Sequence, residues 1–354
     1  MLKTSMRVRF WGVRGSIPCP GPTTIRYGGN TPCIEVRCGD HVLIFDAGTG
    51  LRSLGLELVK DKKIRSVDIF ITHCHLDHVS ALPFFAPFFR EDFQVRVWAG
   101  NLRPTDSIEQ VMRRLMSSPW FPVPIDIFKA SIEFRDFKSG DILRPHDGVI
   151  LRTTQLDHPD GTNGYRLEHA GRTFALLSDT EGFPGKRDKE LVALARGADL
   201  AIYDATFTEE EIVSRADWGH STWARGVRMA NEAGVKHLCL FHHDPSHDDD
   251  FMDTMAAEAN DVRAQRSSRR AKARLSTCDR IDGSRREWLR RFLFEHEQRT
   301  VVAGVPGIDD EHRPVVQDQP FLIVPHPHDR MSGPVLVVAH NYEPKIGFGY
   351  PHRA

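Results

Sequence analysis

The segment at residues 73–78, His-Cys-His-Leu-Asp-His, limits most strongly what this chain can fold into. It directly follows the apolar run 67–71, which has the length of a buried strand. Successive side chains of a strand point to opposite faces, so these polar groups can converge on one point only where the strand breaks into a loop. Imidazole nitrogens and a carboxylate oxygen suit zinc, iron or manganese. We therefore predict a strand end that supplies one pair of ligands to each of two metal ions. The first pair is His73 and His75, and the second is Asp77 and His78.

A chance cluster is the alternative, because the chain contains 18 histidines. The segment lies between a predicted strand and an apolar, helix-like run at 79–89, and this position favours a metal site. The alternation of side chains turns Cys74 away from the metals, so we expect it to pack against apolar neighbours.

The composition is that of an ordinary globular protein, with 354 residues, 40% hydrophobic and 27% charged. The formal net charge of −1 provides no global field for a polyanion, so local charge must hold any anionic substrate. The six cysteines form no CxxC pair and favour a reducing, cytoplasmic setting. The first six residues lack the apolar core of a signal peptide, and the run 81–89 is too short to span a bilayer. We therefore expect no contact with membranes.

Predicted strands and helices alternate along both halves of the chain, and each half begins with hairpins. This order predicts two sheets between outer helices in a domain covering 1–262. The remainder, 263–354, combines a basic helix-like run at 263–274 with a Pro- and His-rich tail. A solvated helix face is favoured over a nucleic-acid contact for the basic run. The predicted strands are 7–12, 34–37, 41–45, 67–72, 95–99, 150–155, 165–169, 172–178, 200–203 and 237–241, and the predicted helices are 51–60, 107–116, 191–195 and 222–233.

Three further strand ends carry residues of the types that bind metals. Asp157-His158 follows one strand, Asp179 ends a second, and His242-His243 follows a third. Each lies just beyond an apolar run, as the segment 73–78 does. Spacing alone leaves His169 open as an alternative to His158, and His243 as an alternative to His242; His247 is a further histidine near this strand end.

Together these motifs resemble the metallo-β-lactamase-fold hydrolases, and within them the ribonuclease Z and phosphodiesterase branch. The H-x-H-x-D-H pattern at 73–78 is highly specific, and the resemblance covers roughly residues 7–250. It implies an α/β fold of the four-layer αββα type. The supporting motifs are Ser178-Asp179-Thr180, Tyr203-Asp204-Ala205-Thr206-Phe207, Gly219-His220-Ser221-Thr222 and Phe241-His242-His243-Asp244-Pro245.

The resemblance also implies two divalent metal ions, with Zn²⁺ expected and Mn²⁺ or Fe²⁺ as alternatives. The implied ligands are His73, His75 and His158 for the first ion, Asp77, His78 and His242 for the second, and Asp179 as a bridge. Two such ions can share a hydroxide and neutralise charge on a phosphoryl group.

The resemblance assigns catalytic roles to three residues. Asp77 would orient the nucleophilic water, His220 would protonate the leaving oxygen, and Asp204 would hold His220. The alternative for His220 is a structural position at a helix start beside the cap at 221–222. The expected function is a phosphodiesterase acting on a cyclic nucleotide, a cyclic sugar phosphate or RNA. An acyl hydrolase for lactones or thioesters and ribonuclease Z-like RNA processing are the alternatives, whereas a non-catalytic binding module is disfavoured because all seven ligand positions are filled.

Two departures from the branch favour a small phosphodiester over transfer RNA. Asp204 replaces the usual Glu, and no Gly/Pro-rich arm is visible between 140 and 204. The aromatic segment 120–122 is expected either to wall a substrate pocket or to pack in the core. Arg14 is weighed as a phosphate contact against an ordinary surface arginine. Homo-oligomerisation is left open.

Overall fold

The computed structural model describes the backbone of residues 6–102, 106–181, 186–278, 299–302 and 335–339, and the side chains among them up to residue 264 except 186–188. The strands of the first sheet are β1 (Met6–Gly12), β2 (Cys33–Cys38), β3 (His41–Phe45), β4 (Ser66–Ile71), β5 (Gln94–Gly100), β6 (Ser131–Phe137) and β14 (Val335–Ala339). Those of the second are β7 (Ile142–His146), β8 (Val149–Leu156), β9 (Thr162–His169), β10 (Arg172–Leu177), β11 (Leu200–Asp204), β12 (His237–Phe241) and β13 (Arg299–Val302). The sheet orders are β14-β1-β2-β3-β4-β5-β6 and β13-β12-β11-β10-β9-β8-β7.

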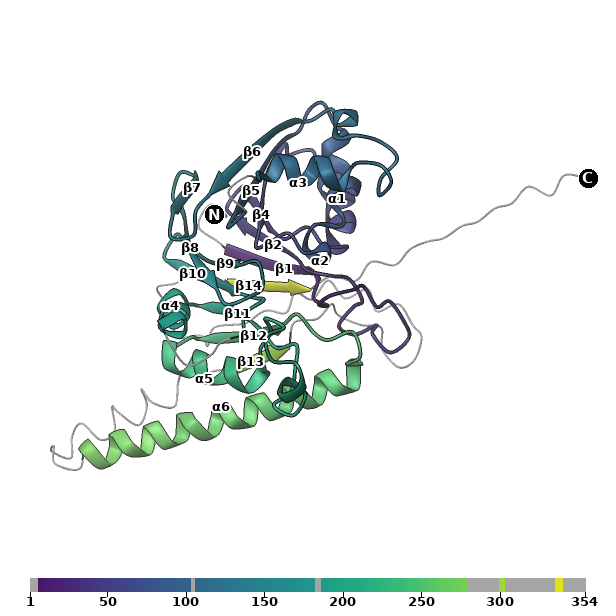
Figure 1. Ribbon diagram of the computed structural model, residues 1–354. Helices are drawn as coiled ribbons and strands as arrows, with labels where there is room; N and C mark the ends of the chain where they lie inside the picture. Colours follow the sequence, from purple (N-terminus) through teal and green to yellow (C-terminus); the bar gives the residue numbers. More distant parts are fainter. Residues whose placement is uncertain (1–5, 103–105, 182–185, 279–298, 303–334, 340–354) are drawn as a thin grey trace, which may run out of the picture.

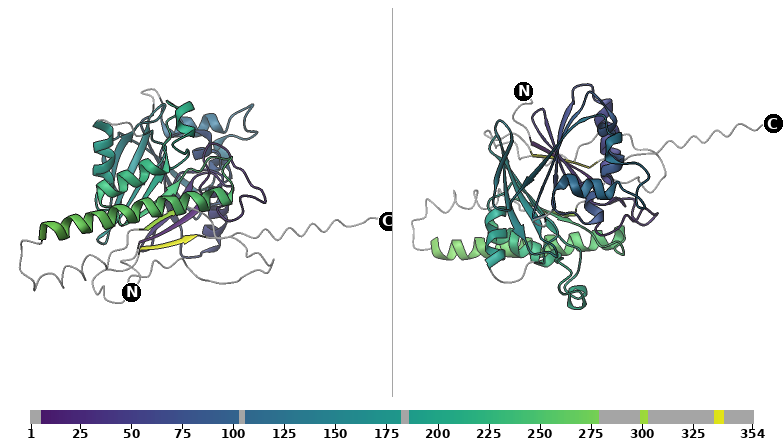
Figure 2. Two further views of the ribbon diagram at one scale, coloured as in Figure 1. Left: turned by 90° about the horizontal axis from the view of Figure 1, so that it is seen from below. Right: turned by 45° about the horizontal axis from the view of Figure 1, so that its top comes forward.

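Helices cover the outer side of each sheet (Figures 1 and 2). On the first sheet, α1 (Gly50–Lys60) packs on β1, and α3 (Ile108–Leu115) packs on β5 and β6. On the second, α4 (Lys186–Ala195) and α5 (Trp223–Ala233) pack on the central strands, while α6 (Asp249–Cys278) packs on α5 and β13. The predicted four-layer αββα sandwich is therefore confirmed.

Strands between two layers bury both of their faces. In β4, Val67 and Ile69 pack under the helices of the first sheet, whereas Phe70 faces the second sheet. The Phe70 ring lies 5.5 Å from that of Phe45 on the neighbouring β3. This double burial explains why the run before the ligand segment is continuously apolar instead of alternating.

Asp68 is the polar exception in β4 and is fully buried. Its carboxylate accepts hydrogen bonds from Arg96 Nη2 at 2.7 Å and Trp98 Nε1 at 2.8 Å. His146 Nε2, on β7 of the opposite sheet, lies 2.8 Å from the same carboxylate. Asp68 therefore links the two sheets through a charged network.

We expect Asp68→Ala to lower the free energy of unfolding by about 3 kcal/mol, because it leaves Arg96 and Trp98 without their acceptor. Denaturant unfolding followed by circular dichroism measures this. The matched control Asp92→Ala removes an exposed carboxylate paired with Arg90 and Arg65, and should cost much less because solvent screens surface ion pairs. Equal losses in the two variants would show that the buried network contributes no special stability.

The run 79–89 is not one helix. A short helix, α2 (Leu76–Val79), is followed by two 3₁₀ turns, Leu82–Phe84 and Ala86–Phe89. Pro83 and Pro87 explain this, because proline has no backbone N–H and disfavours α geometry in the residue before it.

The predicted boundary between 262 and 263 falls within α6. Arg263, the first residue of the basic run, does not lie on a solvated face: it is fully buried and donates from Nη2 to Val235 O at 2.6 Å. Beyond α6, β13 pairs in parallel with β12 and β14 in parallel with β1. The division into 1–262 and 263–354 stays a prediction, since much of the tail lies outside the described residues. In the part of the chain that the structure describes, no helix has the length and apolarity needed to cross a bilayer.

Candidate metal centre and active site

The predicted ligands lie at strand ends on one edge of the sandwich. Strands β10, β11 and β12 run parallel, so their carboxyl ends meet at the same edge, where ligands of α/β proteins commonly bind. The loops after β4 and β8 end beside them. The residues brought together from these five strand ends are His73, His75, Asp77, His78, His158, Asp179, Asp204 and His242.

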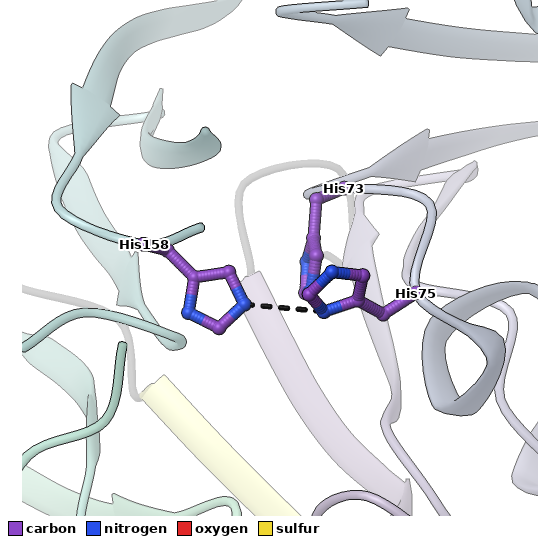
Figure 3. A group of neighbouring side chains, drawn as sticks. All are labelled: His73, His75 and His158. Carbon is purple, nitrogen blue, oxygen red and sulfur yellow. Dashed lines mark hydrogen bonds between the residues drawn. The ribbon is translucent and has the colours of Figure 1, made fainter. Parts of the chain in front are cut away.

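One cluster consists of three histidines. His73 and His75 come from the loop after β4, and His158 comes from the loop after β8 (Figure 3). One ring nitrogen of each lies within 4.8 Å of the other two, and His158 Nε2 is 3.2 Å from His75 Nδ1. Three converging imidazoles are a ligand set that suits zinc.

A second cluster is formed by Asp77, His78 and His242, whose ligand atoms also lie within 4.8 Å of one another. Asp77 Oδ2 is 3.2 Å from His242 Nε2 and 3.3 Å from His78 Nε2. The loop at 15–16 closes over this cluster. Ser16 N donates to Asp77 Oδ2 at 2.7 Å, and Gly15 permits the approach because a Cβ there would lie 2.3 Å from His242 Nδ1.

Asp179 lies between the two clusters. Its Oδ1 is 3.1 Å from His242 Nε2, 3.3 Å from His78 Nε2 and 3.9 Å from His73 Nε2. Asp179 is therefore placed to bridge two ions, the role implied by the resemblance.

Two buried atoms of the site make no hydrogen bond: His73 Nε2 and His78 Nε2. Burying a polar atom without a partner is costly. An imidazole nitrogen that carries a lone pair and faces carboxylates is suited to a divalent cation. The donor set therefore fits metal ions.

The histidines are oriented through their other ring nitrogens. His78 Nδ1 lies 2.9 Å from Asp46 Oδ2, and His158 Nδ1 lies 2.8 Å from Gly219 O. A carbonyl oxygen only accepts, so His158 donates from Nδ1 and keeps the lone pair of Nε2 for the centre. Asp46 also accepts from Thr72 N at 2.8 Å, which fixes the start of the ligand loop. Sequence reasoning missed this role of Asp46, although its position at the end of β3 is a usable signal.

The two buried carboxylates set the electrostatics of the centre. Burial opposes the charged form of His78, but Asp179 and Asp77 outweigh it and hold the pKa of His78 well above its ordinary value. Burial opposes the charged form of Asp179 as well, yet His242 and His78 hold the pKa of Asp179 well below its ordinary value. Burial, reinforced by His78, lowers the pKa of His73 well below its ordinary value. When no metal is bound, protons on His78 and His242 would neutralise the buried negative charge of Asp77 and Asp179. Bound divalent cations can neutralise the same charge.

His220 lies beside both clusters. Its ring stacks on His242 with a centroid distance of 4.7 Å and is 5.2 Å from His158. Its Nδ1 is 2.9 Å from Asp204 Oδ2. The aspartate therefore reaches the ring although it is shorter than the glutamate that is usual at this position. Thr222 caps α5 by accepting from Arg225 N, so the cap does not account for His220.

Asp204 is fully buried and is held from several sides. Ser221 N and Thr206 Oγ1 donate to its Oδ1 at 3.0 and 2.9 Å, and Asp179 N donates to its Oδ2 at 3.1 Å. One carboxylate thus connects the backbone of the proposed bridging residue to the proposed proton donor.

The alternative histidines lie elsewhere. His169 Nδ1 is bonded to Gly148 O, and His247 pairs with Glu211 at 2.9 Å. The ring of His243 lies beside Tyr27, with a centroid distance of 6.2 Å. Among the described residues, none of the three joins a group of potential ligands.

Arg14 agrees with neither of its two interpretations, a phosphate contact or an ordinary surface arginine. Arg14 is fully buried and donates to Gly28 O at 2.9 Å and His247 O at 2.5 Å, which ties two loops together. In the aromatic segment, Trp120 is 81% exposed, whereas Phe121 contacts Phe84 edge-on at 5.6 Å. Core packing therefore accounts for Phe121 but not for Trp120.

With the geometry established, comparison with known proteins identifies the family. The model of the "Beta-lactamase superfamily domain" matches residues 41–243, more than half of the 354 residues. The chain belongs to the beta-lactamase superfamily. As the sequence motifs implied, it is a metal-dependent hydrolase of the ribonuclease Z and phosphodiesterase branch.

Individual relatives agree with this placement. The ribonuclease Z of Halobacterium salinarum is 26% identical over 290 residues, covering 67% of this chain and 87% of that protein. The metallo-beta-lactamase fold protein YhfI from Bacillus subtilis superposes with a TM-score of 0.54 at 20% identity, covering 73% of this chain and 92% of that structure. Human tRNase Z, short form, superposes with a TM-score of 0.52 at 22% identity, covering 67% and 92%. These structural similarities extend to the fold alone.

Proposed function

We propose that this superfamily member hydrolyses phosphodiesters at a site that binds two divalent metal ions. The observation that carries the proposal is His220, which is held by Asp204 and lies against one histidine of each ligand cluster. Departure of an alkoxide from phosphorus needs a proton, and a histidine at this position can supply one. Acyl hydrolysis of a lactone or thioester has less need of this pair.

The proposed ligands are His73, His75 and His158 for one ion, Asp77, His78 and His242 for the other, and Asp179 for both. Bound zinc would polarise a phosphoryl oxygen and lower the pKa of the attacking water. Manganese and iron(II) fit the same donors.

The protein's own groups then have distinct tasks. Asp77 is held by the Ser16 amide and orients the nucleophile. The carboxylate of Asp204 accepts from His220 Nδ1 and fixes the ring and its tautomer, so that Nε2 is the nitrogen proposed to serve the leaving oxygen. Burial of Asp204 keeps this interaction away from solvent.

A small cyclic phosphodiester is the proposed substrate class. Between 140 and 204, the described residues consist of the strands β7 to β11, the helix α4 and short loops, with no extended arm to grip transfer RNA. Exposed Trp120 is suited to stacking on a base. The ribonuclease Z relatives keep RNA as the second candidate, because the names of those proteins state an action on RNA.

Metal-loaded protein should hydrolyse bis(p-nitrophenyl) phosphate and at least one cyclic nucleotide or cyclic sugar phosphate. Removing the metal with 1,10-phenanthroline should reduce hydrolysis to background, and added Zn²⁺ should restore it. The control is an equal concentration of 1,7-phenanthroline, which cannot chelate.

Three results would contradict this proposal. Activity that survives metal removal would exclude the metal-dependent mechanism. Hydrolysis of lactones or thioesters without phosphodiesters would favour the acyl hydrolase. Less than one equivalent of metal in freshly purified protein, with no hydrolysis, would favour a binding module.

A further inference from the structure

A buried glutamate, Glu181, lies two residues after the proposed bridging ligand and belongs to no group of potential metal ligands among the described residues. It is 5% exposed. Its carboxylate accepts from two backbone amides of one turn, Asp217 N at 2.9 Å and Gly219 N at 3.3 Å. A charged acceptor makes stronger hydrogen bonds than a neutral one, so Glu181 restrains this turn.

The turn at 217–219 has an unfavourable backbone conformation. Asp217 has a φ of 66° and Gly219 a φ of 80°. A left-handed conformation is unfavourable for a residue that has a Cβ. Glycine is required at 219 for a second reason, because a Cβ there would lie 2.2 Å from His158 Nδ1. The turn therefore packs directly against His158, a proposed metal ligand.

The backbone of Glu181 is itself fixed on both sides. Its N–H donates to Asp157 O at 2.8 Å, and its carbonyl accepts from Arg225 Nη1 at 2.7 Å. Asp157 precedes His158, and Arg225 belongs to α5, which begins just after His220. Glu181 thus has a defined position relative to both functional histidines.

The restrained turn contacts one of these histidines and leads directly into the other. Gly219 O accepts from His158 Nδ1 at 2.8 Å, and the next residue is His220. We propose that Glu181 is a positioning residue that couples metal binding by His158 to the placement of His220. The zinc half of this inference depends on the proposed ligand set, and the His220 half rests on the proposed phosphodiesterase function.

Glu181→Gln and Glu181→Ala test the coupling. Glutamine offers one acceptor oxygen, but its NH₂ group would face the second backbone N–H, so one of the two hydrogen bonds is lost. Alanine leaves both backbone amides without an acceptor. Glu210→Gln is the matched control, because Glu210 is an exposed glutamate and no side-chain hydrogen bond or ion pair is seen for it in the described part of the chain.

The first measurement is zinc affinity, by competition with a chromophoric chelator. We expect Glu181→Gln to lower the zinc affinity of one site by about 10- to 100-fold and to leave the affinity of the other site unchanged. The reason is that the turn supports only one ligand histidine, His158, through Gly219 O. Wild-type affinities at both sites in Glu181→Gln would overturn the coupling to His158. If Glu181→Ala does not fold, Glu181→Gln alone decides.

The second measurement compares leaving groups. We expect Glu181→Gln to slow a phosphodiester with an alkyl leaving group about tenfold more than bis(p-nitrophenyl) phosphate, whose leaving group needs no proton. Equal slowing of both substrates would overturn the coupling to His220. If the wild type cleaves no phosphodiester, the proposed function fails, and the zinc affinities still decide the coupling to His158.

Discussion

Asp179→Asn is expected to cause the largest loss of all single substitutions, with both zinc ions bound weakly and phosphodiester hydrolysis reduced by about 10³-fold or more. Asp179 Oδ1 lies within 3.9 Å of a proposed ligand nitrogen from each cluster, so its loss affects both proposed metal sites. Asparagine has the same size but removes the negative charge that faces His78 and His242. Zinc content by atomic emission and turnover of bis(p-nitrophenyl) phosphate measure the two effects.

Asp147→Asn provides the matched control for this variant, because Asp147 is an exposed aspartate in the turn between β7 and β8. It should keep the zinc content and turnover of the wild type. Two equivalents of zinc retained in Asp179→Asn at wild-type affinity would show that Asp179 does not bridge.

The fold could be predicted from the sequence where burial imposes a pattern. The run 67–71 is continuously apolar because β4 lies between two packed layers, and its strand was predicted within one residue at its start and end. β6, by contrast, shows only exposed and partly buried positions near the edge of the sheet, and it was not predicted. The segment 335–338 is apolar, but its parallel pairing with β1 joins residues more than 320 positions apart, and no local pattern specifies such a pairing.

The site shows the same division between local and long-range information. The ligand segment and the strand-end residues were found because their chemistry is visible in short stretches of sequence. Spacing did not separate His242 from His243, since adjacent residues differ only in backbone geometry. His242 has a φ of 60°, and its ring meets Asp77, whereas the backbone of His243 forms a bridge with Arg14.

Residues that act through other residues were missed. Asp46 reaches His78 because β3 and β4 are parallel neighbours, and Glu181 reaches the turn at 217–219 from 36 residues away. Both are ordinary carboxylates in the sequence, and only the paired strands and the folded loops show which amide or imidazole each one contacts.

His220→Ala is the second change for which we expect a large effect, a fall of about 10²- to 10⁴-fold in turnover of substrates with alkyl leaving groups. Zinc content should stay at the wild-type value, because His220 only stacks on His242 at 4.7 Å and meets His158 edge-on at 5.2 Å, and each cluster has three proposed ligands without it. Bis(p-nitrophenyl) phosphate should be slowed much less. Steady-state rates for both substrates, with zinc analysis of the same preparations, test this expectation.

A control and a rescue distinguish proton donation from a structural role. His169→Ala removes a histidine bonded to Gly148 O and should leave both rates unchanged. Added imidazole should restore part of the activity of His220→Ala, because the side chain of His220 is 12% exposed and its site can be reached from solvent. If alkyl and p-nitrophenyl substrates are slowed equally and imidazole has no effect, then His220 only supports His242 and Asp204. The proton for the leaving oxygen must in that case come from water, which would remove the observation that favours phosphodiesters over acyl substrates.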